Sequence, residues 1–455
     1  MELMEQCSPL LQRVLTYLHD KKAKVYLVGG CVRDHLLGIR PKDFDIEVYG
    51  MREADLFAAL KQFGECDLVG KQFGIYKLFK LPEADFALPR REVLIGSKHR
   101  DFAIEVDPWL SEKEACRRRD FTMNAILYDP FTKSYVDPYD GRKDIQAGII
   151  RAVDPHTFSE DPLRVYRLAQ FTARTGFKVE EATRRLCSQI VADGRLKSLS
   201  KERIREEYTK LMLAKKPSLG LVLMQEVGML HPLLEALIHT HQRPDYHPGG
   251  SAWIPTLLVV DEASQVKHLT SNPLGFMLSA LLHDVGKPET TDDFGHAIGH
   301  EVIGEKRARQ FMRAIYGQKK LENYVAMNVY CHLKLMVYAT SSIRDKTYLK
   351  FLALINGKTT LNDLYYLTMC DARGCQTDVQ HSLQALDRFM HDYPSRLGST
   401  APQPLVNGSD VMALGVQPGP QVKALLQEAY DLQLGGHQRS GILKVLKRRL
   451  EDGTE

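Results

Sequence analysis

The 455-residue sequence predicts an α+β multidomain protein in which a mixed α/β head is followed by an all-helical neck, body and tail. Up to Val153, short apolar runs alternate with amphipathic stretches, whereas the apolar spacing after Val153 is helical. The composition, 44% hydrophobic and 26% charged, is that of a globular protein. The chain is too long for one hydrophobic core, which predicts several domains.

The head is expected to begin with a helix and to build a sheet. Apolar residues at helical spacing predict a helix over residues 8–20. An apolar run that ends at Gly29-Gly30, followed by an amphipathic stretch up to Gly38, predicts a strand, a tight turn and a helix. A second helix is expected over 52–63. Further strands are expected, in a sheet of about five, at 44–49, 74–79, 84–88, 102–106 and 125–128.

The remainder of the chain divides where its composition changes. The stretch 239–250 is rich in His, Pro and Gly, and 399–409 is rich in Pro, Gly and Ser, as expected of exposed linkers. No internal repeat or low-complexity tract separates the helical segments. The predicted domains are a head at 1–154, a neck at 155–245, a helical body at 246–398 and a helical tail at 399–455.

Charge and hydropathy exclude several classes of protein. The net charge of +4 neither demands nor forbids a polyanionic partner. The longest apolar stretch, 274–282, is too short for a membrane span, and Glu2 and Glu5 stand where a signal peptide would be basic. Eight cysteines without a C-x-x-C pair are typical of reduced thiols. These patterns predict a soluble, cytoplasmic protein with no membrane partner.

The sharpest motif combines Gly29, Gly30 and Arg33 with Asp43 and Asp45. Glycines after a strand let a ligand approach the backbone, and the arginine in the first helical turn offers a charged fork to a phosphate. The two aspartates are two apart on a predicted strand, so both carboxylates project from one face. A pair of Mg²⁺ ions needs such carboxylates for in-line phosphoryl transfer. Each motif alone also fits a plain turn or a solvated strand end; their order favours the phosphoryl-transfer site.

The segment Val28–Gly50 resembles the signature of the class II bacterial tRNA nucleotidyltransferase/poly(A) polymerase family, in the polymerase β superfamily. The resemblance continues, in the family's order, through 118–125, 137–141, 160–167 and 200–207. It implies a polymerase β-like nucleotidyltransferase head that uses Mg²⁺. The implied reaction is template-independent addition of CCA to the 3′ end of tRNA from CTP and ATP, with release of pyrophosphate.

The resemblance also implies roles for the matched residues of the first motif. Asp43 and Asp45 would bind the catalytic metals, while Gly29, Gly30 and Arg33 would contact the triphosphate. A third acidic residue is usual beside such a pair, and Asp85 is the candidate because a neighbouring strand would bring it alongside.

The later motifs would recognise the sugar and the base. Asp120, with Arg119, would sense the ribose 2′-hydroxyl, and Asn124 would help to hold the site. Asp161 and Arg164, three apart on a predicted helix, would reproduce a Watson–Crick edge and select C or A. The plain alternatives are a charged helix end and a surface ion pair. Arg167 belongs to the same nucleotide-binding set.

Two features of the head leave alternatives open. Arg90-Arg91 and Lys98-His99-Arg100 bracket a Gly-containing loop that either clamps substrate or is simply solvated. Gln170 stands where many family members carry another arginine, so one expected phosphate contact is missing.

A second constellation lies in the predicted body. The segment 281–288 resembles the HD signature of metal-dependent phosphohydrolases, in which His283 and Asp284 combine with a remote Asp371. Where that family has its first histidine this chain has Pro255, which cannot ligate a metal. A retained helical scaffold is therefore expected, and a second divalent metal site is the alternative. The remaining histidines that offer ligands are His296, His300 and His332.

The expected partners are tRNA, CTP and ATP, with the RNA recognised by its shape and phosphates along the helical arm. A poly(A) polymerase or an enzyme adding only CC or only A would share every head motif. An HD phosphohydrolase and a non-catalytic RNA-binding protein are rivals from other classes. In the tail, four cations either touch RNA phosphates or form a solvated helix face: Lys444, Lys447, Arg448 and Arg449.

Overall fold

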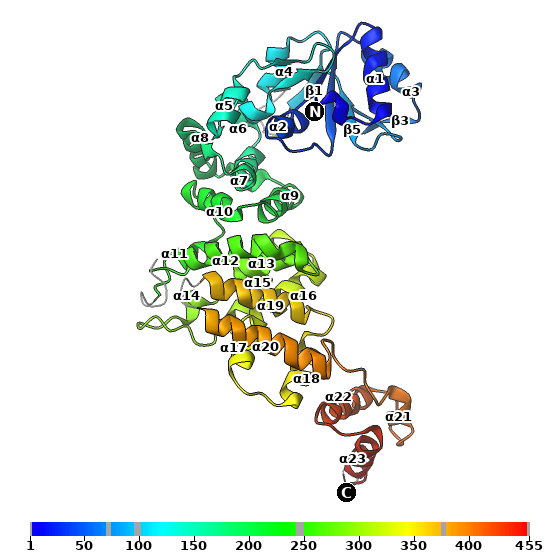
Figure 1. The fold of residues 1–455 in the computed structure, drawn as a ribbon, viewed down its shortest axis with the longest axis vertical. Coiled ribbons are helices and arrows are strands. Elements are labelled where there is room, and N and C mark those ends of the chain that lie inside the picture. The colour runs from blue at the N-terminus through cyan, green and yellow to red at the C-terminus, as the bar shows by residue number, and fades with distance from the viewer. Residues whose placement is uncertain (1, 70–73, 95–101, 243–249, 375–378, 453–455) are drawn as a thin grey trace. The chain divides into compact units, whose positions relative to one another are not determined.

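The structure, a computed structural model, describes residues 2–69, 74–94, 102–242, 250–374 and 379–452 (Figure 1). The chain separates into two compact units. Unit 1 comprises Met1–Leu211 and Leu219–Met229, and unit 2 comprises Met212–Ser218 and Leu230–Glu455. Unit 1 carries the main sheet, while unit 2 is built of helices (Figure 1). The mixed α/β head and the helical remainder are thereby confirmed.

Unit 1 is organised around a mixed sheet of seven strands in the order β3-β4-β5-β2-β1-β8-β9. At its centre β2 pairs antiparallel with β1 and parallel with β5. The strands are β1 (Lys24–Val28), β2 (Phe44–Tyr49), β3 (Cys66–Val69), β4 (Ile75–Leu78), β5 (Ala84–Ala87), β8 (Leu127–Asp129) and β9 (Ser134–Val136).

The sheet differs from the prediction in size and membership. The expected count of about five strands is wrong because the edge strands β3 and β9 are too short to show a clear two-residue period. The strand expected at 102–106 exists as β7 (Phe102–Val106), but it pairs with β6 (Arg90–Leu94) in a separate two-stranded sheet. A further short parallel pair joins β10 (Ile149–Ile150) to β11 (Lys178–Val179).

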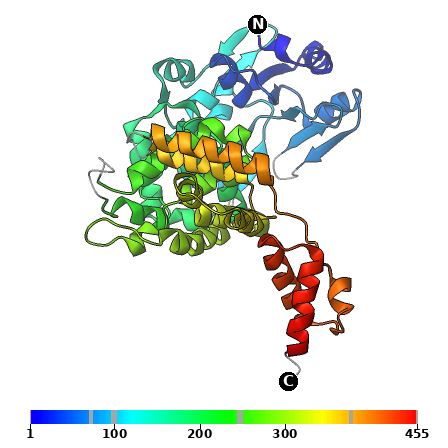
Figure 2. The same ribbon diagram turned by 60° about the horizontal axis from the view of Figure 1, so that its bottom comes forward.

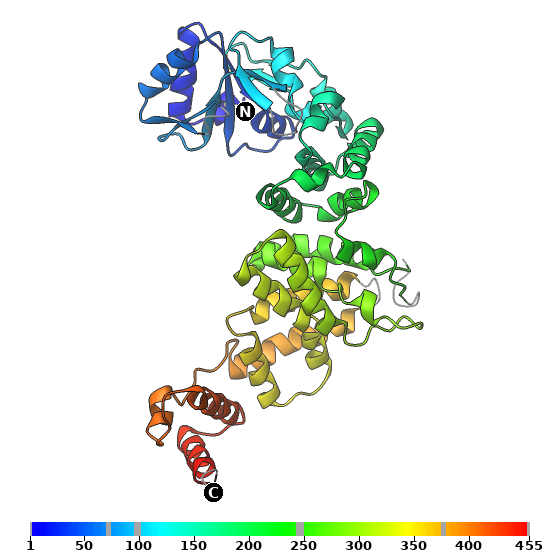
Figure 3. The ribbon, with the colours of Figure 1, turned by 180° about the vertical axis from the view of Figure 1, so that it is seen from behind.

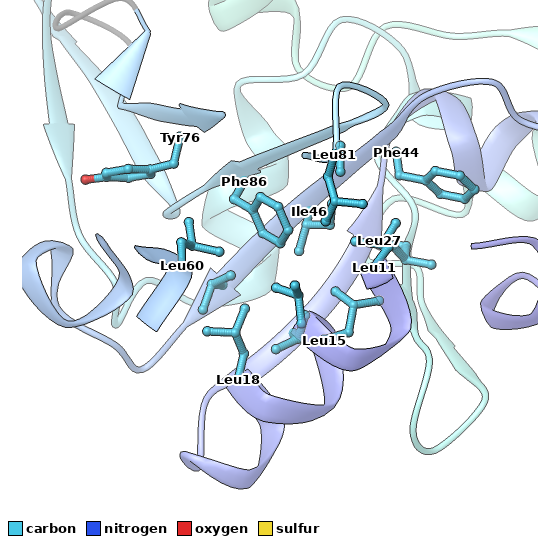
Figure 4. Close-up of a cluster of buried hydrophobic side chains, with 14 of the residues drawn as sticks. Leu11, Leu15, Leu18, Leu27, Phe44, Ile46, Leu60, Tyr76, Leu81 and Phe86 are labelled. Atoms are coloured by element: carbon cyan, nitrogen blue, oxygen red, sulfur yellow. The ribbon is translucent and has the colours of Figure 1, made fainter. Parts of the chain in front are cut away.

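Helices cover one face of the main sheet and create its core. The predicted first helix is confirmed as α1 (Pro9–Asp20), which begins after Ser8, whose hydroxyl caps the N–H of Leu11. Its leucines pack against Ile46 of β2 and Phe86 of β5 (Figure 4). α3 (Glu53–Lys61), also predicted, adds Leu60 to the same cluster. Residues 44, 46 and 48 of β2 therefore face this core, and residues 45, 47 and 49 face the opposite side.

The remaining helices of unit 1 extend the head into the predicted neck (Figure 3). α2 (Gly30–Leu36) follows β1 through Gly29, whose φ of 68° lies in the left-handed region that glycine tolerates. The other helices are α4 (Glu112–Arg117), α5 (Gly141–Ala147), α6 (Pro155–Glu160), α7 (Leu163–Thr175), α8 (Glu181–Ala192), α9 (Lys201–Met212) and α10 (Pro217–Glu226).

Unit 2 consists of a helical body and three tail helices. The tail helices, drawn in orange and red in Figure 2, lie at the C-terminal end of the chain. They pack around a small apolar cluster that includes Val411, Leu425 and Ile442. The helices are α11 (Pro232–Ile238), α12 (Trp253–Val266), α13 (Pro273–Leu282), α14 (Lys287–Thr290), α15 (His300–Ile315), α16 (Lys319–Cys331), α17 (Lys334–Thr340), α18 (Asp345–Ile355), α19 (Leu361–Gly374), α20 (Gln380–Leu397), α21 (Gly408–Met412), α22 (Pro420–Leu434) and α23 (Arg439–Asp452).

Candidate nucleotide site and histidine cluster

A cavity of about 420 Å³ in unit 1 gathers residues that are far apart in the sequence. It contains all nine residues predicted to bind the nucleotide, together with one of the two predicted metal ligands and two residues that were assigned no role. Its lining is Gly29, Gly30, Arg33, Asp45, Arg119, Asp120, Asn124, Asp161, Leu163, Arg164, Arg167 and Arg203.

Gly29 forms the floor of the turn between β1 and α2. A Cβ atom at this position would lie 3.0 Å from Arg119 Nη1 and 3.4 Å from Asp45 Oδ2. Its positive φ adds a second reason why only glycine fits here. The turn therefore brings the backbone close to both a cation and a carboxylate of the cavity.

Arg33 is buried but keeps a fixed orientation at the cavity wall. Its guanidinium donates to Asp34 Oδ1 at 2.9 and 2.7 Å and to Asn124 Oδ1 at 2.7 Å, and it stacks over the Phe171 ring. Arg174 bonds the other oxygen of Asp34 at 2.7 Å. Burial lowers the pKa of Arg33, opposed by the charge of Asp34. The arginine is held in place before any ligand binds.

Asp120 links Asn124 and Arg167, two residues that line the cavity. Its Oδ1 accepts the amide of Asn124 at 2.9 Å, and its Oδ2 accepts Arg167 Nε at 2.7 Å. Burial alone would raise the pKa of Asp120, but the charges of Arg167 and Arg164 and these hydrogen bonds lower it. Asp120 is therefore an anion that also orients two neighbouring residues.

Asp161 and Arg164 both line the cavity, but the prediction that they share one helix is wrong. Asp161 follows the end of α6 with extended backbone, and α7 begins at Leu163. The cause is Pro162, since a proline disfavours helical backbone at the residue before it. Asp161 Oδ1 instead accepts the N–H of Leu163 at 3.1 Å and so caps the new helix.

The side chains of Asp161 and Arg164 each form further hydrogen bonds. Arg203 of α9, which was assigned no role from the sequence, donates to Asp161 Oδ2 at 2.7 Å. Arg164 donates to the carbonyl of Thr157 at 2.7 Å and to the carbonyl of Arg118. The guanidinium of Arg164 is thus anchored to backbone on one side of the cavity.

Three aspartates lie on the face of the sheet opposite the α1 core. Asp43 immediately precedes β2, and Asp45 is its first outward residue. The parallel register of β2 and β5 places Asp85 directly opposite Asp45. Desolvation raises the pKa of Asp45, and the charges of Asp85, Glu47 and Asp43 raise it further, while Arg119 opposes them. Carboxylates that repel one another in this way favour a cation between them.

Asp45 and Asp85 also line a second, smaller cavity of about 220 Å³ that contains Arg90, Arg118 and Arg119. The Oδ1 atom of Asp85 lies 3.1 Å from Lys77 Nζ across the β4–β5 pair. Lys77 therefore offsets the negative charge of Asp85 in this structure.

Glu47 is a second residue, after Arg203, that the sequence reasoning missed. It lies on β2 two residues after Asp45, and its Oε1 accepts Arg118 Nη2 at 2.9 Å and Arg119 Nη2 at 3.0 Å. Its Oε2 accepts the hydroxyl of Tyr49 at 2.9 Å. The available signal was the two-residue period, because Asp43, Asp45 and Glu47 alternate along one face.

Other candidates of the head lie elsewhere. Gln170 is buried on α7 and is absent from the lining of the described cavity, which already holds five arginines. Arg91 pairs with Glu105 at 2.9 Å across the β6–β7 ladder. The segment Lys98-His99-Arg100 lies outside the described residues.

Unit 2 contains a buried cluster of histidines and aspartates. Asp284, His300 and His332 offer ligand atoms that all lie within 4.8 Å of one another. His283, which directly follows α13, points its Nε2 at Asp284 Oδ2 at 3.3 Å and at Asp371 Oδ1 of α19 at 3.4 Å. The three residues of the HD resemblance are therefore joined by two of the remaining histidines.

The imidazoles share one mode of attachment. In each of His283, His300 and His332, Nδ1 lies 2.6–2.8 Å from the backbone carbonyl three residues earlier. This leaves Nε2 free to face the cluster, as a second hydrogen bond does for metal-ligating histidines. Burial and the nearby positive charge of His283 lower the pKa of His332 to about 4, which keeps it neutral.

Two other residues bear on the fit of this cluster. Pro255 is buried within α12, so the position of the family's first histidine offers no ligand. Lys287 Nζ lies 2.6 Å from Asp284 Oδ2 and neutralises that carboxylate. His296 lies apart, half-exposed and paired with Asp292 at 3.2 Å.

Comparison with known protein families gives two matches. Residues 25–151 match the family described as the poly A polymerase head domain. Residues 176–239 match the family described as the "Probable RNA and SrmB- binding site of polymerase A".

Two relatives of this chain carry the name multifunctional CCA protein. The multifunctional CCA protein of Stenotrophomonas maltophilia is 34% identical over 380 residues, 82% of this chain and 88% of the relative. The multifunctional CCA protein of Actinobacillus pleuropneumoniae is 33% identical over 365 residues, 77% of this chain and 85% of the relative.

Solved structures share the fold. A CCA-adding enzyme in complex with CTP aligns with a TM-score of 0.62 at 21% identity, covering 99% of this chain and 97% of its own. A Thermotoga maritima CCA-adding enzyme complexed with tRNA(CCA) aligns with a TM-score of 0.59 at 21% identity, covering 98% and 97%. Within the described residues, every helix falls short of the length and apolar character that a membrane crossing requires.

Proposed function

We propose the mechanism of this chain from the premise that it belongs to the family of the multifunctional CCA proteins. It is a tRNA nucleotidyltransferase that adds CMP, CMP and AMP to the 3′ end of tRNA, using CTP and ATP as substrates. One observation carries the residue assignments: the phosphate-, sugar- and base-directed residues expected from the sequence line a single cavity together with Asp45.

The enzyme uses a divalent metal, as this family does, and we assign Mg²⁺ to it. The fit rests on three aspartates that share one face of the sheet and whose charges raise the pKa of Asp45, since carboxylate oxygens are the ligands that Mg²⁺ prefers. Asp43 and Asp45 would hold the metal, and Asp85, in register with Asp45, would complete the set. Bound Mg²⁺ supplies positive charge that stabilises the charge on the reacting phosphoryl group.

The protein residues then position the nucleotide. Arg33, held by Asp34 and Asn124, offers its charge to the triphosphate at the turn where Gly29 lets a ligand approach. Asp120, held ionised by Arg167, accepts a hydrogen bond from the ribose. The 3′-hydroxyl oxygen of the RNA attacks the α-phosphorus, loses its proton to water, and pyrophosphate leaves from the opposite side.

Base selection is assigned to Asp161 and Arg164. A carboxylate accepts from the exocyclic amine that C and A share, while a guanidinium donates to a ring nitrogen or carbonyl. Asp161 lies at the α6–α7 junction and Arg164 on α7, and both line the cavity. The RNA itself would contact the helices of the 176–239 segment by shape and phosphate charge. We further propose that the reaction takes place in the cytoplasm. We also propose that the chain is divided into four domains, the head, neck, body and tail.

Extension of tRNA transcripts tests the function. Transcripts that end at the discriminator base, at C and at CC are incubated with enzyme, Mg²⁺ and CTP, ATP or both, and the product lengths are read on a sequencing gel. Growth by C, C and A that then stops is expected. Addition of only CC or only A, or a long A tail, would replace CCA addition by one of its rivals.

The buried histidine cluster favours a second role for unit 2, as a transition-metal site. Three buried imidazoles with anchored Nδ1 atoms meet two aspartates, which suits a divalent ion with nitrogen preference. Metal content of the purified enzyme, compared with His300→Ala and with a matched His296→Ala control, tests it. Equal metal content in all three proteins would reject the site. Hydrolysis of bis(p-nitrophenyl) phosphate, lost in His300→Ala but kept in the control, would extend the role to phosphohydrolysis.

A further inference from the structure

Glu47 occupies the third position of the acidic face of β2 and is almost entirely buried. Its side chain is 2% exposed, whereas the side chain of Asp85 is 34% exposed. Both oxygens are used, since Oε1 accepts two arginines and Oε2 accepts Tyr49. On the same sheet face Glu47 lies roughly 7 Å along the strand from Asp45.

Arg119 stands between two carboxylates that compete for it. It pairs with Glu47 at 3.0 Å, while among the residues that the structure describes Asp45 has no ion pair. Yet Arg119 Nη1 and Asp45 Oδ2 lie beside the same point above Gly29, at 3.0 and 3.4 Å from it. A rotation of the arginine side chain would therefore bring the two charges together.

The arginines also retain donors that a second partner would satisfy. The Nε atoms of Arg118 and Arg119 are buried and have no hydrogen-bond partner among the described residues. A buried unsatisfied donor favours any rearrangement that supplies an acceptor. With the charge of Glu47 removed, the nearest carboxylate that offers one to Arg119 is that of Asp45.

We propose that Glu47 is a positioning residue that holds Arg119 off Asp45 and so keeps this carboxylate available to the metal. The proposal rests on the assignment of Asp43 and Asp45 as metal ligands. It assigns Glu47 no contact with substrate. The mechanism is competition: an arginine paired with Asp45 would occupy the oxygens that the cation needs and would add a repelling charge.

The test is Mn²⁺ binding to the nucleotide-free full-length enzyme, followed by electron paramagnetic resonance of free Mn²⁺. Binding that Asp45→Asn removes is counted as binding to the head, which separates it from any metal in unit 2. Glu47→Gln keeps the shape of the side chain and loses its charge. We expect its Mn²⁺ affinity at the head to fall about tenfold, because one negative charge is lost and Arg119 is released.

The matched control is Glu112→Gln. Glu112 accepts the hydroxyl of Tyr26 at 3.0 Å and Lys24 Nζ at 3.3 Å, which repeats the tyrosine–glutamate bond of Glu47 without an active-site arginine. Its Mn²⁺ affinity should equal that of the native enzyme. The double variant Glu47→Gln/Arg119→Met should regain native affinity within about twofold, since no competitor for Asp45 remains.

Two results would overturn the proposal: native Mn²⁺ affinity in folded Glu47→Gln, or a loss that Arg119→Met does not rescue. Should Glu47→Gln fail to fold, Arg119→Met alone decides. Its Mn²⁺ affinity is expected to equal or exceed the native value, and a loss beyond about threefold would show that Arg119 helps to build the metal site. If Asp45→Asn binds Mn²⁺ as the native enzyme does, the metal assignment itself fails, whatever Glu47 does.

Discussion

The cavity of unit 1 and the histidine cluster of unit 2 differ in how their polar side chains are held. In the cavity, acids and bases pair with one another across segments, as Asp120 does with Arg167 and Asp161 with Arg203. In the cluster, each imidazole is tied through Nδ1 to the backbone carbonyl three residues earlier in the chain. Side chains in pairs can exchange partners when a ligand arrives, whereas side chains tied to backbone hold one arrangement.

The difference matches what each region is proposed to bind. A site that receives CTP, then ATP, and a lengthening RNA needs groups that pair anew at each step. A resident metal needs ligands that do not move, and its histidines must stay neutral. The pKa of about 4 at His332 meets that requirement. Burial would lower the pKa of His283, but Asp284 and Asp371 raise it to about 10, so this imidazole must lose its proton before it can bind a metal.

The largest effect is expected when a proposed metal ligand in the cavity of unit 1 is replaced. Asp45→Asn should lower the rate of CMP and AMP addition about a thousandfold or more, since charge stabilisation by a bound metal is worth several kcal/mol. Single-turnover extension of tRNA measures it. Binding of tRNA, followed by filter retention, should stay native; near-native turnover would remove Asp45 from the metal site.

A smaller loss is expected where the backbone must admit the ligand. Gly29→Ala would meet Arg119 and strain a positive φ, so kcat/KM for both nucleotides should fall about a hundredfold. Steady-state kinetics with CTP and with ATP measure it, with Gly38→Ala as the control. Gly38 also has positive φ but has no neighbour within 4 Å of its Cβ position. Equal losses in both variants would assign the effect to backbone strain alone.

Nucleotide choice should respond to the base-directed pair. Arg164→Ala should reduce the preference for the correct nucleotide about tenfold, because one base contact is removed. Misincorporation of ATP at the first position, read by sequencing, measures it. Arg184→Ala, on α8 and paired with Glu181, is the control outside the cavity. An unchanged preference with slower addition would leave Arg164 a structural role through Thr157.

The smallest effect is expected at the histidine cluster of unit 2, whose side chains are tied to backbone. Added Ni²⁺ should raise the Tm of the native protein by about 3 °C, and this rise should vanish in His332→Ala, because binding to the folded state alone stabilises it. Differential scanning calorimetry measures it. CCA addition should be equal in both proteins. A Tm rise that survives in His332→Ala would place the ion elsewhere.

Local spacing predicted much of the head. The strand before Gly29, the helix after it and the alternation of Asp43 and Asp45 all follow from short-range patterns, which the described structure contains. The resemblance then supplied distant members of the cavity, such as Asp120, whose closeness no spacing could reveal. Glu47 was missed because an acid on a strand is usually solvated, and only the fold shows it buried under two arginines.

Other misses have the same origin in three-dimensional context. Pro162 moves Asp161 off the helix that its spacing to Arg164 suggested. Arg203 reaches the cavity from α9 by tertiary packing, which leaves no local signature. His300 and His332 could be named from the sequence only as possible ligands, and their closeness to Asp284 depends on how three helices pack.

Asp45 and Asp85 come together only when β2 and β5 pair correctly as the sheet folds. Asp45 and Asp85 come from segments forty residues apart, and they face each other only in the one register that the structure shows. A slip of one residue would send Asp85 to the apolar face and leave the other acids alone. A chain whose sheet has not closed correctly thus lacks the complete acid set, and we expect such a copy to lose nucleotide addition rather than to add the wrong nucleotide.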